Sequence, residues 1–254
     1  MGYDYWPKYV PVAERRKKSA KNAADLQKKG IYLNPVVIVG RLIAKTFWGK
    51  SWCQNLESYS DYSNRLPRGR TYVRNGSVID LQVSKGQIKA QVSGSSIYKI
   101  VIDIEPMTAV KWKELVGICS GKIDSLIELL QGKFSKGVME ILTEKETGLF
   151  PKPEEISMRC SCPDSASMCK HLAAVLYGIG AALDEKPEYL FQLRQVDQVD
   201  LIATASNSSL IQEGSGESTL GDDDLSSLFG IEMEPQIEIS TSLKKKTSVK
   251  KNKK

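Results

Sequence analysis

A chain of 254 residues, 41% of them hydrophobic and 26% charged, is long enough to bury one large core or two modest ones. It has no run of about 18 apolar residues, so we expect no membrane span, and its first residues lack the pattern of a secretory signal. The five cysteines are an odd number, which argues against a disulfide framework and for a reducing, cytoplasmic location.

The net charge of +6 is unevenly distributed. Residues 1–100 carry 18 Lys and Arg against 6 Asp and Glu, residues 101–243 carry 11 against 24, and residues 244–254 carry seven lysines and no acid. A basic front is typical of nucleic-acid binders. A solvated surface that faces the acidic part of the same chain would have the same composition, so both interpretations stay open.

The first hundred residues predict helices and then a sheet. A charged helix is expected over 13–29, ended by Gly30, and a short strand over 35–39. A helix is also expected over 46–59, with one apolar face formed by Trp48, Trp52, Leu56 and Tyr59. Such a stripe more often packs in the core than serves as a base-stacking platform. Alternating apolar residues predict an antiparallel meander of three strands, at 78–83, 87–92 and 98–104.

The second half of the chain has a helical period. Helices are expected near 110–116, 123–130 and 138–142, and, after a proline-containing break at 151–153, over 172–183 and 189–193. From about residue 203 the composition is rich in Ser, Gly, Thr and Asp, which predicts a disordered tail.

Three of the five cysteines lie beside the only histidine, in the pattern Cys160-x-Cys162-x6-Cys169-x-His171. Zn²⁺ prefers four such ligands in a tetrahedron, and four protein ligands leave no position for water. The spacing therefore predicts one structural zinc ion that ties a hairpin to the start of a helix. Packing of the cysteines as small hydrophobic residues, with His171 as a helix cap, is the plainer alternative, and an iron–sulfur cluster is disfavoured because it usually takes four cysteines.

The segment from Cys160 to Tyr177 resembles the SWIM zinc finger. Further landmarks of prokaryotic SWIM zinc finger family proteins are similar in this sequence, at 46–52, 65–72, 148–151 and 190–194, so that the resemblance covers roughly residues 1–200. The resemblance implies a DNA-binding or protein-interaction module, associated in prokaryotes with helicase-like ATPases of the Swi/Snf type. No G-x-x-x-x-G-K-[ST] loop occurs here, so any ATPase would be a separate partner.

Together these patterns predict an α+β fold: an antiparallel β-meander with helices, followed by a small β-hairpin/helix zinc finger and a disordered tail. Four parts are expected. They are a basic N-terminal region with the amphipathic helix and meander (1–105), a helical connector (106–150), the SWIM-type finger with its following helices (151–200), and a tail with an acidic/apolar motif and a lysine-rich end (201–254).

The arginines on the turn-rich segment 64–70 are candidate phosphate contacts, with Tyr62 and Tyr72 able to stack on bases. Salt bridges to Asp61 and Asp80 are the alternative use of these arginines. The predicted nucleic-acid-binding residues are Arg65, Arg68, Arg70, Arg74 and Lys170. Cys53 and Cys119 are expected to be buried packing residues.

Three function classes compete. The first is a non-enzymatic zinc-finger protein that binds nucleic acid, with DNA preferred over RNA, for which the resemblance implies a role as accessory to a helicase-like ATPase. The second is a protein-interaction adaptor, in which the finger is only a structural staple and the partner motif comprises Leu225, Leu228, Phe229 and Ile231. The third is an enzyme, for which the sequence offers no convincing set of catalytic residues. Oligomeric state is left open.

Overall fold

The computed structural model describes residues 10–59, 64–120, 122, 136–164, 166–201 and 203, all within a compact unit spanning Met1–Gln212. The helix predicted over 123–130, the predicted tail and its Leu225–Ile231 motif lie outside the described residues. In the part of the chain that is described, no helix is both long and apolar enough to span a membrane.

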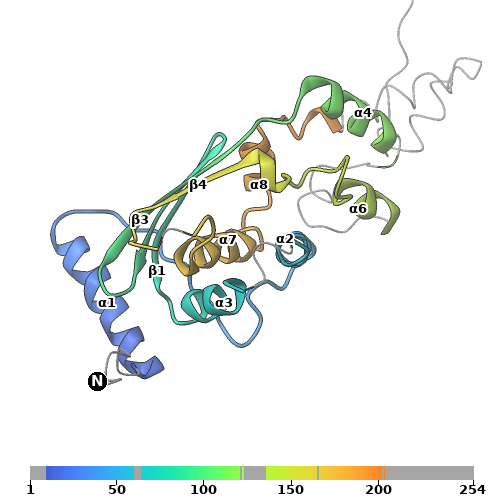
Figure 1. The fold of residues 1–254 in the computed structure, drawn as a ribbon. Helices are drawn as coiled ribbons and strands as arrows, with labels where there is room; N and C mark the ends of the chain where they lie inside the picture. The colour runs from blue at the N-terminus through green and yellow to red at the C-terminus, as the bar shows by residue number, and fades with distance from the viewer. Residues whose placement is uncertain are drawn as a thin grey trace, which may run out of the picture. The chain divides into compact units, whose positions relative to one another are not determined.

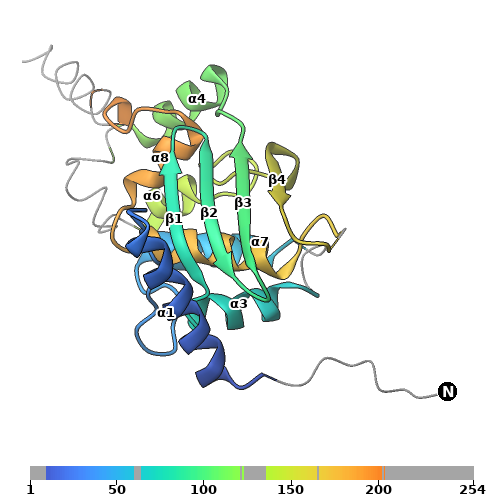
Figure 2. The ribbon, with the colours of Figure 1, turned by 90° about the vertical axis from the view of Figure 1, so that its left-hand side faces the viewer.

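Four antiparallel strands form one sheet in the order β1-β2-β3-β4 (Figure 2). The strands are β1 (Val78–Ser84), β2 (Gln87–Ser93), β3 (Ile97–Ile104) and β4 (Ile156–Cys160). The predicted α+β fold and its three-stranded meander are confirmed. β4 comes from the segment expected to form a separate finger, and it extends the meander by pairing with β3.

Three helices pack together on one face of this sheet: α2 (Phe47–Glu57), α3 (Leu66–Arg74) and α7 (Lys170–Ala182) (Figure 1). α7 is the centre of the core, because every residue from His171 to Gly180 is buried. Trp48 and Trp52 of α2 are 1% and 3% exposed, so the aromatic stripe belongs to the core, as the sequence predicted.

The opposite face of the sheet is crossed by α1 (Val12–Lys28) (Figure 2). Its contacts with the β2–β3 turn are polar: Lys18 Nζ donates to the Ser95 carbonyl at 3.0 Å, and Asn22 Nδ2 donates to Ser93 Oγ at 2.9 Å. Ser19 is the buried residue of this helix. α1 is therefore held to the sheet by a few hydrogen bonds, and most of its surface faces solvent.

Residues 35–39 do not form the predicted strand. The segment runs along β1, with Val36 N donating to the Val78 carbonyl and Leu81 N donating to the Asn34 carbonyl. The ladder does not continue because Asn34 N donates to the Asp80 carboxylate, while the Leu81 carbonyl accepts from the side chain of Asn34 instead.

The prediction that residues 64–70 form a turn-rich basic segment is also wrong. Most of this segment belongs to helix α3. Pro67 and Gly69 resemble turn residues in the sequence, but Pro is compatible with the first helical turn. Gly69 has a packing role instead: a methyl group there would lie 2.5 Å from the Ala173 Cβ of α7. The glycine lets the backbones of α3 and α7 approach closely.

The remaining described elements are α4 (Ala109–Cys119), α6 (Lys136–Leu142), the short 3-10 helix η2 (Pro153–Glu155) and α8 (Glu188–Arg194). α4 and α6 lie between β3 and β4 in the chain, where the sequence predicted a helical connector.

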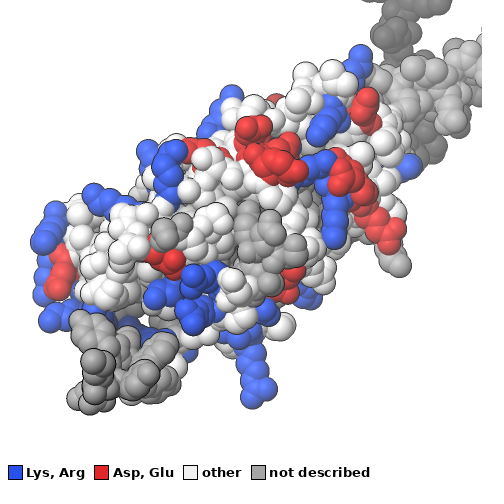
Figure 3. Space-filling view, in the orientation of Figure 1, with Lys and Arg blue, Asp and Glu red and all other residues white. Residues whose placement is uncertain are grey.

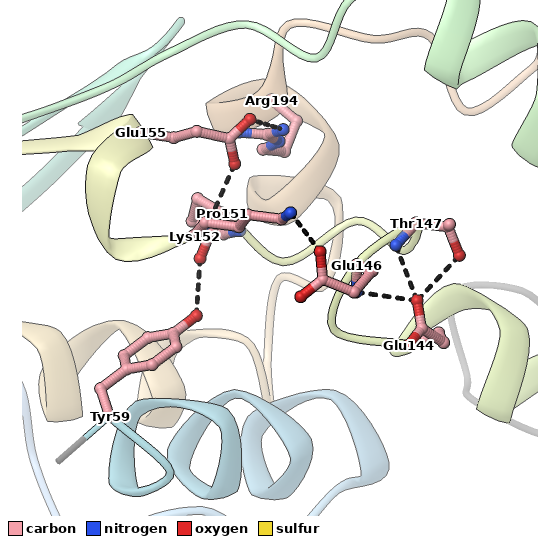
Figure 4. Close-up of polar contacts among 8 residues, drawn as sticks. All are labelled: Tyr59, Glu144, Glu146, Thr147, Pro151, Lys152, Glu155 and Arg194. Carbon is pink, nitrogen blue, oxygen red and sulfur yellow. Dashed lines mark hydrogen bonds and ion pairs between the residues drawn. The ribbon is translucent and has the colours of Figure 1, made fainter.

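A polar junction fixes the chain just before β4 (Figure 4). The guanidinium of Arg194, 1% exposed, donates to Glu155 Oε1 at 3.0 Å and to the Glu105 carbonyl at 2.9 Å. The other carboxylate oxygen of Glu155 accepts from Lys152 N, and Tyr59 Oη donates to the Pro151 carbonyl. These bonds join η2 to α8 and the residue before Lys152 to Tyr59, just after α2, so they fix the path of the chain into β4.

Candidate metal centre

The predicted ligands converge where β4 meets the start of α7. Cys160 ends β4, Cys162 follows in a turn, Cys169 is the N-cap residue of α7, and His171 lies in the first turn of that helix. The four ligand atoms all lie within 4.8 Å of one another, and the group could hold a metal ion.

The nitrogen that faces the sulfurs is Nδ1 of His171. It lies 3.9 Å from Cys160 Sγ and 3.8 Å from Cys169 Sγ. Cys169 has the extended backbone of an N-cap, and its sulfur accepts a hydrogen bond from Leu172 N at 3.5 Å. A thiolate at this position is stabilised by the positive end of the helix dipole as well as by that hydrogen bond.

The thiols are close enough to affect one another's ionisation. The hydrogen bond between the Cys160 and Cys169 side chains raises the pKa of Cys160, and burial raises it further. The same hydrogen bond lowers the pKa of Cys169, and the hydrogen bond with His171 acts in the same direction. A divalent cation bound by these sulfurs would favour the ionised form of every thiol, so that no proton remains between them.

Two tyrosines and a glycine enclose the imidazole of His171, which is 3% exposed. The Tyr98 ring stacks on it at a centroid distance of 4.3 Å, and the Tyr72 ring meets it edge-on at 5.3 Å. A methyl group at Gly94 would lie 3.2 Å from His171 Nε2 and 2.8 Å from the Tyr98 ring. Nε2 is buried and has no hydrogen-bond partner among the described residues. The ring is thus positioned by packing, with Nδ1 directed at the sulfurs.

The predicted nucleic-acid contacts lie on α3 and at the start of α7, but two of them are engaged in ion pairs. Arg65 pairs with Asp164 at 3.6 Å, and Arg70 pairs with Glu57 at 3.4 Å. These are not the acids expected from the sequence: Asp80 instead accepts from Asn34 N and Gln82, and Asp61 lies outside the described residues.

Arg68 and Arg74 are exposed, whereas the ammonium of Lys170 lies 5.6 Å from the centre of the Tyr72 ring. Since Tyr72 also packs on His171, it is part of the candidate metal centre rather than a free stacking surface.

Sequence reasoning missed the residues around the imidazole. Tyr98 is the first residue of the strand predicted over 98–104, and Gly94 lies between two predicted strands. Neither pattern shows that these residues lie beside His171. Of the other cysteines, Cys119 is buried as predicted; Cys53 is half-buried, and its burial raises the pKa of the thiol to about 12.

Comparison with known proteins identifies a relative whose name states no function. The chain is 35% identical over 164 residues to the uncharacterized protein Rv2102 of Mycobacterium tuberculosis, an alignment that covers 63% of this chain and 59% of the relative. The chain therefore spans less than two thirds of the length of that relative. No family model matches the sequence, and no solved structure matches it. The resemblance to SWIM fingers stays a prediction.

Proposed function

We propose that this chain is a non-enzymatic, zinc-binding protein of the SWIM-finger type that binds nucleic acid, with DNA as the preferred ligand. The zinc part of the proposal is supported by the ligand geometry. Zn–S bonds of about 2.3 Å and Zn–N bonds of about 2.0–2.1 Å in a tetrahedron separate sulfur from nitrogen by about 3.6 Å. The Nδ1–sulfur distances of 3.8 and 3.9 Å are close to that value.

A structural role for the ion follows from its ligands. Three thiolates and an imidazole fill the four positions that zinc prefers, so no position is left for a water molecule or a substrate. On this proposal the ion joins the end of β4 to the N-terminus of α7 and performs no chemistry.

The observation that carries the nucleic-acid proposal is the position and charge of α1. Residues 12–29 contain seven Lys and Arg against two acids, and the helix lies on the sheet face opposite α2, α3 and α7. Figure 3 shows basic side chains along the edge formed by α1 and again over α3, whereas acidic side chains gather mainly toward the opposite side. A basic helix with most of its surface in solvent can contact phosphates without losing core packing.

The test replaces three exposed lysines of α1 in one variant, Lys17→Gln, Lys21→Gln and Lys28→Gln, and measures binding of duplex DNA by fluorescence anisotropy over a range of salt concentrations. Each lost phosphate contact should reduce the slope of log affinity against log salt by about 1. The matched control removes the same charge elsewhere, by Lys113→Gln, Lys122→Gln and Lys145→Gln, and should bind like the wild type. Equal binding by the two variants, or no salt-dependent binding by the wild type, would contradict the proposal.

A protein-interaction adaptor is the second candidate, and it is favoured by exposed apolar residues in the segment between α1 and α2. Tyr32, Val37, Val39 and Leu42 are 85%, 72%, 71% and 59% exposed. A partner protein that binds here would bury the exposed side chains of Val37 and Val39. Association that survives nuclease treatment and is lost in a Val37→Ser, Val39→Ser variant would favour the adaptor.

The partnership with a separate helicase-like ATPase is also part of our proposal. Its support is the resemblance alone, and any such ATPase would be a separate chain because this sequence has no phosphate-binding G-x-x-x-x-G-K-[ST] loop.

A further inference from the structure

A second site lies between α2, α3 and the segment that precedes α2. It is a pocket of about 190 Å³, lined by the apolar side chains of Leu42 and Ile43 and by the cationic side chains of Lys50, Arg70 and Arg74. Tyr177 of α7 also lines it. Along α7, Tyr177 is six residues from His171, a rise of about 9 Å, so this pocket is distinct from the metal centre.

One side of the pocket is a fixed polar group. Tyr177 Oη donates to Glu57 Oε1 at 2.7 Å, Arg70 Nη1 pairs with the same oxygen at 3.4 Å, and the Arg70 guanidinium lies 5.7 Å from the centre of the Tyr177 ring. The ion pair and the ring contact orient the guanidinium, and the hydrogen bond from Tyr177 positions the carboxylate of Glu57. A guanidinium has five N–H donors, and the ion pair engages Nη1, so Arg70 keeps donors for a second anion.

The charge of the lining is unbalanced. Among the described residues that line the pocket, Glu57 is the one acid, and it is already bound to Arg70 and Tyr177. Lys50 and Arg74 are exposed, and within the described ranges neither side chain makes an ion pair. The side chains of Lys50 and Arg74 thus bring two positive charges to the pocket beside the guanidinium of Arg70. Two positive charges match the charge of a dianion.

We propose that this pocket binds a phosphate monoester, with the phosphate between Lys50, Arg70 and Arg74 and the attached sugar against Leu42 and Ile43. The volume agrees with a small group, since pockets for drug-sized ligands measure about 300–1,000 Å³. The phosphate belongs either to a free nucleotide or to the end of a nucleic-acid strand. The site goes beyond the proposed function, because neither source requires that α1 bind the interior of a duplex.

The experiment is isothermal titration of the zinc-loaded full chain with adenosine 5′-monophosphate, inorganic phosphate and adenosine, in a buffer free of phosphate. Adenosine 5′-monophosphate should bind saturably at one site, phosphate more weakly, and adenosine not at all. The variant Lys50→Gln, Arg74→Gln should weaken this binding at least tenfold. Both residues are exposed, so folding should be preserved, as circular dichroism will check. The variant Lys113→Gln, Lys122→Gln loses the same charge outside the pocket and should bind like the wild type.

A second arm separates the two sources by comparing one oligonucleotide with a 5′-phosphate and with a 5′-hydroxyl. A preference for the phosphorylated strand that disappears in the Lys50→Gln, Arg74→Gln variant assigns the pocket to strand ends. Equal binding of the two strands, together with saturable binding of adenosine 5′-monophosphate, assigns it to free nucleotides. Absence of saturable binding by both the monophosphate and the phosphorylated end, or affinities unchanged in the pocket variant, would overturn the proposal. Failure of the α1 variants to affect duplex binding would leave these readouts intact, so the two proposals fail separately.

Discussion

At the scale of single residues, the candidate metal centre depends on how the imidazole of His171 is positioned. The two nitrogens of His171 have different surroundings: Nδ1 faces the sulfurs of Cys160 and Cys169, whereas Nε2 is enclosed beside Gly94 and has no hydrogen-bond partner among the described residues. Metal-bound histidines usually donate the second N–H to a carboxylate or carbonyl, which fixes the ring. Here the stacked ring of Tyr98 performs that orienting role.

A Gly94→Ala variant should therefore bind metal more weakly. The added methyl group would lie 2.8 Å from the Tyr98 ring and 3.2 Å from Nε2, so the stacked pair must shift and carry Nδ1 away from the sulfurs. Loss of an outer-shell contact typically lowers metal affinity about 10–100-fold, and we expect the lower end of that range. Competition against a chromophoric chelator measures the affinity. An unchanged affinity in the folded variant would show that the aromatic packing does not position His171.

At the scale of elements, the helical layer is arranged around close contacts with α7. Gly69 of α3 lies against Ala173, and Gly49 of α2 lies so close to α7 that an added methyl group would clash with its backbone at Gly180. Asp184, just after α7, accepts hydrogen bonds from Lys45 N and Thr46 N at the start of α2. The helix that begins at the metal centre is thereby joined to both of its neighbours.

Two helical glycines allow a matched test of this packing. In Gly69→Ala the methyl group would lie 2.5 Å from the Ala173 Cβ, whereas at Gly117 of α4 the described residues place nothing within 4 Å of the added methyl beyond its chain neighbours and the backbone of the helix itself. Overpacking typically costs about 1–3 kcal/mol, and Gly→Ala in an open helix stabilises by about 0.5–1 kcal/mol. Urea unfolding should therefore give a lower free energy of unfolding for Gly69→Ala and a slightly higher one for Gly117→Ala. Equal values for the two variants would contradict close contact between α3 and α7.

Which elements the sequence could predict depends on the range of the interactions that form them. The strands over 78–83 and 87–92 and the helix after His171 follow from local periodicity and were predicted within a residue or two. The ligand set was also local, since the four ligands lie within twelve residues. The α3 helix was missed because Gly69 is explained by a contact with α7, about a hundred residues away, and no local pattern contains that contact.

At the scale of the whole described unit, the ligand-bearing segment is part of the main core rather than an appended finger. β4 pairs with β3 along its length, with Cys160 opposite Ile100, and α7 supplies the centre of the helical layer. The sequence predicted the four candidate ligands but not the pairing of β4 with β3, because that pairing joins segments separated by the long 105–155 connection. Removal of the metal should for that reason affect more than the residues that bind it.

Chelation of the metal should destabilise the whole unit. Structural zinc contributes about 10–16 kcal/mol of apparent binding free energy in finger peptides near pH 7, comparable with the total stability of a typical domain, about 5–15 kcal/mol. Without the ion, the N-terminus of α7 loses its connection to β4, and the buried face of α7 supports α2, α3 and β1–β3 at once. We expect hydrogen exchange of the chelated protein to show lost protection in β1–β3 and α3 as well as over 156–195, with the same pattern in a His171→Ala variant. Lost protection confined to 156–195 would instead mean that β4 and α7 unfold as an independent finger, and unchanged protection would mean that the four side chains hold no structural ion.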